Sequence, residues 1–104
     1  MRQTKTFKRY KTVVRNGKDG QTMIAYYETP IVTFDKQEIV LKTGKWRTRT
    51  TMTRMNQVSR HFRLGYRVMR KEANWFVEYQ EKTHGFTSEQ VRLDRRSGEV
   101  KAMS

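Results

Sequence analysis

An apolar stripe is the clearest pattern in the chain. Its members are spaced three, three and four residues apart, as neighbours on one face of an α-helix are: Met52, Met55, Val58 and Phe62. Thr50 or Thr51 can cap the start of such a helix, and Gly65 supplies a glycine stop after its end. The pattern predicts an amphipathic helix over about residues 51–63.

Stretches rich in β-branched and aromatic residues lie on both sides of this helix. Residues 7–15 and 21–28 flank an Asn-Gly turn, which predicts a β-hairpin. Thr29-Pro30 should interrupt the strand pairing after this hairpin, because proline cannot donate to a β-ladder. Further strands are expected at residues 31–35, 38–43, 66–71 and 75–80.

The last quarter of the chain has a weaker pattern. Residues 81–89 are expected to form a loop, and residues 91–102 form either a closing hairpin or a loosely held tail. The predicted fold class is α+β, with an antiparallel sheet of order β-β-β-β-α-β-β, a C-terminal hairpin as an option, and the helix packed on one face. The length fits a single small basic domain over residues 1–104, less ordered at residues 1–6 and about 81–104.

The distribution of charge indicates a class of binding partner, which the hydrophobic periodicity does not. The net charge is +13, and residues 1–18 and 39–71 contain basic side chains without a single acid. Such a field attracts polyanions and speeds their encounter with the protein. The alternative interpretation is that the cations only solubilise an exposed face, although ordinary solvated faces mix both signs.

The entrance to the predicted helix combines cations with hydroxyl groups, in the segment TGKWRTRTTMTRMNQ at residues 43–57. Threonine hydroxyls and backbone N–H groups there lie at the positive end of the helix dipole, which favours phosphate. The residues predicted to bind phosphate are Lys45, Arg47, Thr48, Arg49 and Thr50, with Thr51 beside them. The alternative is that the threonines only cap the helix while Trp46 packs in the core.

The face of the helix opposite the apolar stripe is polar and free of acids. Its side chains are of the types that hydrogen-bond phosphates and base edges, namely Arg54, Asn56, Gln57, Arg60 and Arg63, beside Thr53 and His61. The N-terminal hairpin adds Arg9, Lys11 and Arg15, next to Tyr10, Tyr26 and Tyr27. The other large aromatics, Trp46, Tyr66, Trp75, Phe76 and Tyr79, are expected mainly in the core. This polar face equally fits an ordinary wet helix surface.

Catalytic and cofactor motifs are missing from the sequence. There is no cysteine, the two histidines stand alone, and no phosphate-binding glycine motif occurs. Asp35, Glu38 and Asp94 are expected in or beside turns. No enzyme activity, cofactor, metal site or membrane insertion is therefore expected.

The central segment resembles a family of small phage proteins. The string TPIVTFD, then T-G-x-W-R-T-x-T-T-x-x-R-M-N-Q at residues 43–57, then LGYRV and WFVEY, is similar to proteins without assigned activity from tailed bacteriophages and related mobile elements. The resemblance covers residues 29–79 and implies a phage origin. It further implies action in the host bacterial cytoplasm, with the virion as an alternative location, but it implies no mechanism.

Taken together, the sequence favours a non-enzymatic nucleic-acid-binding protein, with DNA preferred to RNA as the partner. A second hypothesis is a module that docks on an acidic host protein of transcription, nuclease or defence systems. A third is a structural or packaging component that associates with DNA, for which a dimer through exposed edge strands is open.

Overall fold

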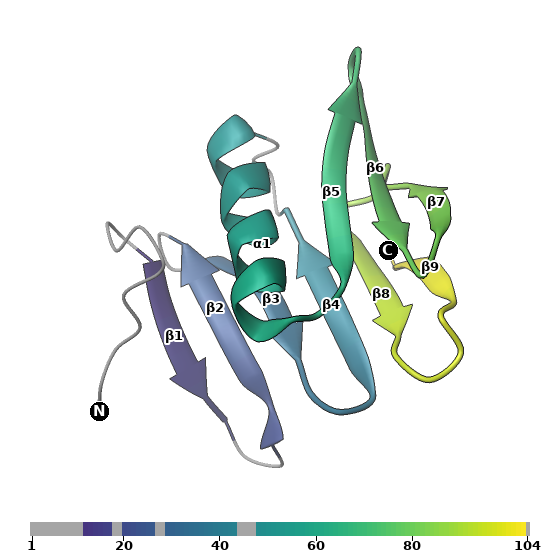
Figure 1. The fold of residues 1–104 in the computed structure, drawn as a ribbon. Coiled ribbons are helices and arrows are strands. Elements are labelled where there is room, and N and C mark those ends of the chain that lie inside the picture. The colour runs from purple at the N-terminus through teal and green to yellow at the C-terminus, as the bar shows by residue number, and fades with distance from the viewer. Residues whose placement is uncertain (1–11, 18–19, 27–28, 44–47, 104) are drawn as a thin grey trace.

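The computed structural model describes residues 12–17, 20–26, 29–43 and 48–103. Within these ranges, four strands precede one helix and five strands follow it (Figure 1). The elements are β1 Thr12–Asn16, β2 Thr22–Tyr26, β3 Thr29–Phe34, β4 Glu38–Lys42, α1 Arg49–Phe62, β5 Tyr66–Lys71, β6 Asn74–Tyr79, β7 Lys82–Gly85, β8 Gln90–Asp94 and β9 Val100–Met103.

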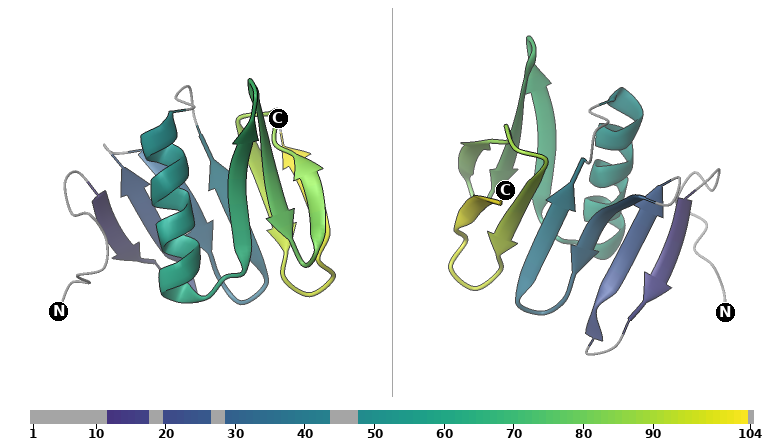
Figure 2. Two further views of the ribbon diagram at one scale, coloured as in Figure 1. Left: turned by 45° about the horizontal axis from the view of Figure 1, so that its top comes forward. Right: turned by 180° about the vertical axis from the view of Figure 1, so that it is seen from behind.

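The strands form two antiparallel sheets. Sheet A has six strands in the order β1-β2-β3-β4-β8-β9, and sheet B has three in the order β5-β6-β7. Helix α1 and sheet B lie along the same face of sheet A, as the tilted view and the view from behind show (Figure 2). The predicted α+β class, with mainly antiparallel sheet and a helix on one face, is confirmed; the presence of a second sheet was not anticipated.

One apolar core joins the helix and both sheets. In sheet A the buried residues of β4 and β8 face each other across the ladder, in the pairs Ile39–Leu93 and Leu41–Val91. In sheet B, Trp75 of β6 contacts Phe86, with ring centroids 6.0 Å apart. The expected core aromatics Tyr66, Trp75 and Tyr79 are buried, Phe76 is half-buried, and Trp46 lies outside the described residues.

The helix begins earlier than predicted, while its apolar stripe is as expected. Met55 and Val58 are fully buried, and Met52 and Phe62 pack against the same core. The N-cap is Thr48, upstream of the predicted Thr50 or Thr51, because the Thr48 hydroxyl accepts the Thr51 N–H at 3.1 Å.

Two local expectations were wrong for identifiable reasons. Thr29 and Pro30 do not interrupt the sheet but begin β3, where a register shift opposite Ile24 and Ala25 accommodates the missing donor. The loop expected at residues 81–89 contains β7. A tight turn with positive φ at Gln80 and Glu81 (51° and 69°) leads into this strand, without the glycine or asparagine that normally marks such a turn.

The segment after residue 89 forms the hairpin of β8 and β9 rather than a loose tail. β8 pairs with β4, so this hairpin completes sheet A beside a strand that lies far away in sequence. The turn between β8 and β9 includes Gly98 at φ 82°, a left-handed conformation that glycine adopts without strain.

Candidate nucleic-acid interface

The N-terminus of α1 is a capped helix end beside a threonine-rich pocket. Besides accepting from Thr51, Thr48 accepts the Met52 N–H at its carbonyl oxygen, 3.1 Å away, and its hydroxyl lies 3.1 Å from the Thr51 hydroxyl. A pocket of about 490 Å³ opens here. Its lining residues come from sheet A and the helix start: Tyr26, Thr29, Ile31, Thr43, Thr48, Thr50 and Thr51. The capping role considered for the threonines is therefore present, whereas phosphate binding at this end stays a prediction.

The predicted cations divide into several environments. Arg49, Arg60 and Arg63 are exposed on α1 or at its end, and Arg15 is exposed on β1 at an edge of sheet A. Lys45, Arg47, Arg9 and Lys11 lie outside the described residues. Strands β2 and β3 and helix α1 lie between Arg15 and strand β5, so Arg15 is far from Arg67 and Arg70 of that strand (Figure 1).

Arg54 does not lie on the outward face, where the helical pattern placed it. The residue is 8% exposed, and its guanidinium carbon lies 5.1 Å from the centroid of the Tyr26 ring. This distance fits a cation–π contact with the side of sheet A. The buried side of the helix is therefore wider than the apolar stripe, because sheet A also covers Arg54. Tyr26, which the sequence placed beside the cations of the N-terminal hairpin, is half-buried and packs against the apolar core.

Asn56 holds the helix to strand β5. Its Nδ2 group donates to the Val68 carbonyl at 2.9 Å, and its Oδ1 accepts the Val68 N–H at 2.8 Å. One turn later, the Ser59 hydroxyl donates to the Tyr66 carbonyl at 2.7 Å and accepts the Tyr66 N–H at 3.1 Å. Helix side chains thus satisfy both backbone groups of two alternate residues on an edge strand, as a neighbouring strand would. Ser59 was not singled out from the sequence.

Tyr66 adds a hydrogen bond to the same junction, with a side chain of β5 bonding to the backbone of α1. Its hydroxyl donates to the Met55 carbonyl at 2.6 Å, and burial raises the pKa of this phenol well above its ordinary value. The group therefore stays a neutral donor at physiological pH. The α1–β5 junction is accordingly held by directional bonds that fix the helix against the strand.

A groove of about 480 Å³ lies between α1 and β5. Arg49 contributes from the first turn of the helix, and Arg67 and Arg70 contribute from β5. Among the described residues that line this groove, the acid is Glu72, whose carbonyl oxygen accepts from Arg70 Nε at 2.9 Å. Met52, Asn56, Val68, Met69 and Trp75 complete the lining. Arg67 and Arg70 were missed as site residues, although the acid-free segment 39–71 contains both.

A third and more open depression of about 410 Å³ lies at the C-terminal end of α1, lined by Gln57, Arg60, His61 and Arg63. Arg63 has the left-handed φ of 56° of a C-cap, and its N–H bonds to the Ser59 carbonyl. Gln57 is half-buried, and its Oε1 has no hydrogen-bond partner within the described ranges. His61 packs edge-on against Phe62, with centroids 4.7 Å apart. This depression extends the cationic surface of α1 beyond Arg49.

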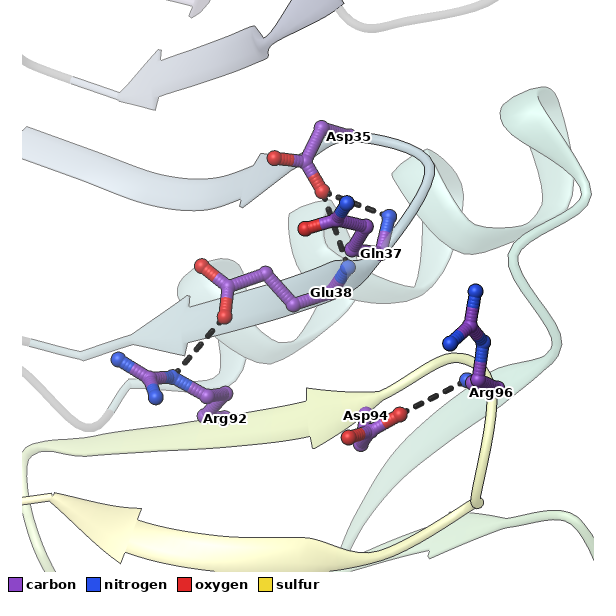
Figure 3. A network of polar contacts seen from close by, with 6 residues as sticks. All are labelled: Asp35, Gln37, Glu38, Arg92, Asp94 and Arg96. Atoms are coloured by element: carbon purple, nitrogen blue, oxygen red, sulfur yellow. Dashed lines mark hydrogen bonds and ion pairs between the residues drawn. The ribbon is translucent and has the colours of Figure 1, made fainter.

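The carboxylates of two neighbouring turns accept hydrogen bonds from backbone N–H groups (Figure 3). Asp35 Oδ1 accepts the N–H groups of Gln37 and Glu38 at 2.8 and 3.0 Å. Asp94 Oδ1 accepts those of Arg96 and Ser97, also at 2.8 and 3.0 Å. These backbone bonds lower the pKa of Asp94. The expected turn roles of both aspartates are confirmed.

Acidic and basic side chains lie side by side near these turns. Glu38 forms a cross-strand ion pair with Arg92 at 3.0 Å (Figure 3), and Arg95 Nη1 donates to the Asp35 carbonyl at 2.6 Å. In the part of the chain that the structure describes, no three histidine or carboxylate side chains converge in a way that could hold a metal ion. Over the same residues, no helix has the length and apolar character needed to cross a membrane.

Comparison with known proteins gives a family. A family model described as Kyanoviridae Gp96 protein matches residues 1–94, and the chain therefore belongs to this family of cyanophage proteins. The match confirms the phage origin and extends well beyond residues 29–79, to include the basic N-terminal segment and β8. No curated protein and no solved structure matches the chain.

Proposed function

We propose that this Kyanoviridae Gp96 family protein is a non-enzymatic nucleic-acid-binding protein whose contact surface is the α1–β5 groove. The observation that carries the proposal is the placement of Arg49, Arg67 and Arg70 around one groove. These arginines come from two elements that side-chain hydrogen bonds fix against each other. A rigid frame keeps cations in place at a low entropic cost when phosphate binds.

The contrast with the rest of the surface supports this choice of site. Around the turns of Figure 3, cations lie beside carboxylates, and Arg92 is paired. Around the groove, three arginines face one lining acid among the described residues, Glu72, and residues 39–71 contain no acid. Arg60 and Arg63 add positive charge at the other end of α1. Binding would release counterions from the phosphate backbone, and the field would speed association. DNA in the infected host cell is the first partner to test.

The test is a fluorescence-anisotropy titration of single-stranded and duplex DNA at several NaCl concentrations. The double variant R49A/R67A is expected to weaken binding and to flatten the slope of log K against log salt. Each lost contact should reduce the slope by about 0.7 on single strands or 0.9 on duplex. The variant K82A/K101A removes equal charge from exposed positions on β7 and β9 that do not line the groove. It should leave most of the slope intact.

Two outcomes would overturn the proposal. One is no binding to any nucleic acid at low salt, and the other is an equal loss in both double variants, because only a diffuse field would then act. Capture of an acidic host protein after nuclease treatment, together with absent DNA binding, would instead favour the protein-docking hypothesis.

A further inference from the structure

Strand β5 presents a series of backbone groups to the helix, and the series is only partly occupied. In an antiparallel pair, residues that bond to the neighbouring strand alternate with residues whose N–H and C=O point away. Tyr66 and Val68 point away from β6, because their backbone groups bond to Ser59 and Asn56. The pairing of β5 with β6 continues without a shift through Arg70 and Lys71. The backbone N–H and C=O of Arg70 therefore also point toward α1.

No helix side chain completes the series at Arg70. Met52 lies one helical turn before Asn56 and is the helix residue that corresponds to Arg70. Where Asn56 has an amide and Ser59 a hydroxyl, Met52 has a thioether. No bond from α1 to the Arg70 backbone exists among the described residues. The groove of about 480 Å³ opens at this point, lined by both Met52 and Arg70. Helix and strand diverge toward this end (Figure 1).

We infer that the open N–H and C=O of Arg70 receive the hydrogen-bonding edge of an unpaired nucleobase, and that the preferred ligand is single-stranded nucleic acid. This inference rests on the proposed function and names its substrate class. The contact would copy the one made by Asn56, whose amide offers a donor and an acceptor side by side. Every base offers such a donor–acceptor edge when it is unpaired, whereas in a duplex the pairing edge is occupied.

The remaining lining suits the same ligand. Met52 and Met69 are half-buried and offer apolar, polarisable surface to a base, while Arg49 and Arg67 are exposed and offer charge to the flanking phosphates. An extended peptide fits less well. Adding a strand to the edge of β5 needs several successive free backbone groups, and those of Tyr66 and Val68 are already taken.

The test compares three labelled probes of equal length: a base-bearing single strand, an abasic strand with the same phosphates, and a duplex. The base-bearing strand is expected to bind about tenfold more tightly than the abasic strand, as one donor–acceptor pair can provide. Met52→Gln places an amide beside Arg70 and should abolish that ratio while preserving the salt slope. Thr53→Gln, which adds the same side chain at an exposed position of α1, should keep the ratio.

A second measurement does not depend on the variants. In an amide NMR spectrum of the native protein, the Arg70 signal should shift with the base-bearing strand but not with the abasic strand. Equal binding of abasic and base-bearing strands, or tighter binding of duplex, would overturn the inference while the proposed function survived. An Arg70 shift caused only by an acidic peptide would overturn it in favour of a protein partner. Failure to bind any of the nucleic-acid probes would overturn both proposals.

Discussion

Two regions of the molecule use side chains to complete backbone hydrogen bonding, and they do so in different ways. At the α1–β5 junction, neutral side chains serve both the N–H and the C=O of a strand residue, across seven residues for Ser59 and twelve for Asn56. At the turns of Figure 3, carboxylates accept only N–H groups, two or three residues away.

The first kind of contact fixes the tertiary structure, and the second stabilises a local turn in a way that depends on charge. A neutral amide or hydroxyl does not titrate near physiological pH and joins two elements, so its loss affects tertiary structure. A carboxylate in a turn stabilises a local conformation and depends on pH. The three variants below probe this contrast, beginning with the one expected to cost the most stability.

Asn56→Ala should have the largest effect, because it leaves the N–H and the C=O of Val68 without their partner. The expected loss in the free energy of unfolding is about 2–3 kcal/mol, as measured by urea denaturation. Hydrogen exchange of the Val68 amide should accelerate more than that of the β4–β8 ladder. As a control, Gln57→Ala removes an amide whose Oε1 lacks a partner among the described residues, and should change stability by less than about 0.5 kcal/mol. Equal losses would contradict a specific role for Asn56.

Ser59→Ala should cost less, about 1–2 kcal/mol, because the smaller hydroxyl leaves a smaller void although it also serves two backbone groups. Local exchange at the Tyr66 amide is the diagnostic measurement. Ser59→Thr keeps the hydroxyl and should recover part of the loss if its extra methyl group fits. An unchanged Tyr66 exchange rate in Ser59→Ala would show that the bond does not restrain the strand.

Asp94→Asn should have the smallest effect, and its effect should depend on pH. Because the folded pKa of Asp94 is lowered, its stabilisation is present above the ordinary value of 3.8 and is lost as pH falls through the folded pKa. The difference in urea midpoint between the native protein and the variant should therefore be visible at neutral pH and shrink in strong acid. A difference that does not change with pH would show that the charge of Asp94 contributes nothing to stability.

The same contrast explains what could be predicted from the sequence. The turn roles of Asp35 and Asp94 were readable because an Asx turn lies within a few residues, and the apolar stripe of α1 was readable because it repeats locally. The β6–β7 hairpin was missed because Gln80 and Glu81 carry no turn signature. The pairing of β4 with β8 is a long-range contact that no local pattern specifies.

For the candidate site, the helical pattern identified exposed arginines but assumed that every polar position faces water. Arg49 and Arg60 are exposed as expected. Asn56 instead contacts a strand of a sheet that was not anticipated, and Arg54 extends over Tyr26. Periodicity reports the angle of a residue around the helix. It does not report which part of the protein packs against that side of the helix.

The position of β8 beside β4 also constrains how the protein is made. A ribosome synthesises β4 well before it adds residues 90–94, so the nascent chain carries β4 with an open ladder edge until β8 emerges. An open edge of apolar strands is where chains associate wrongly during synthesis. Most of the acid-free stretch of residues 39–71 is translated during this interval, and its positive charges repel those of another nascent chain. The charge that we propose binds nucleic acid in the finished molecule would thus also keep neighbouring chains apart on the polysome.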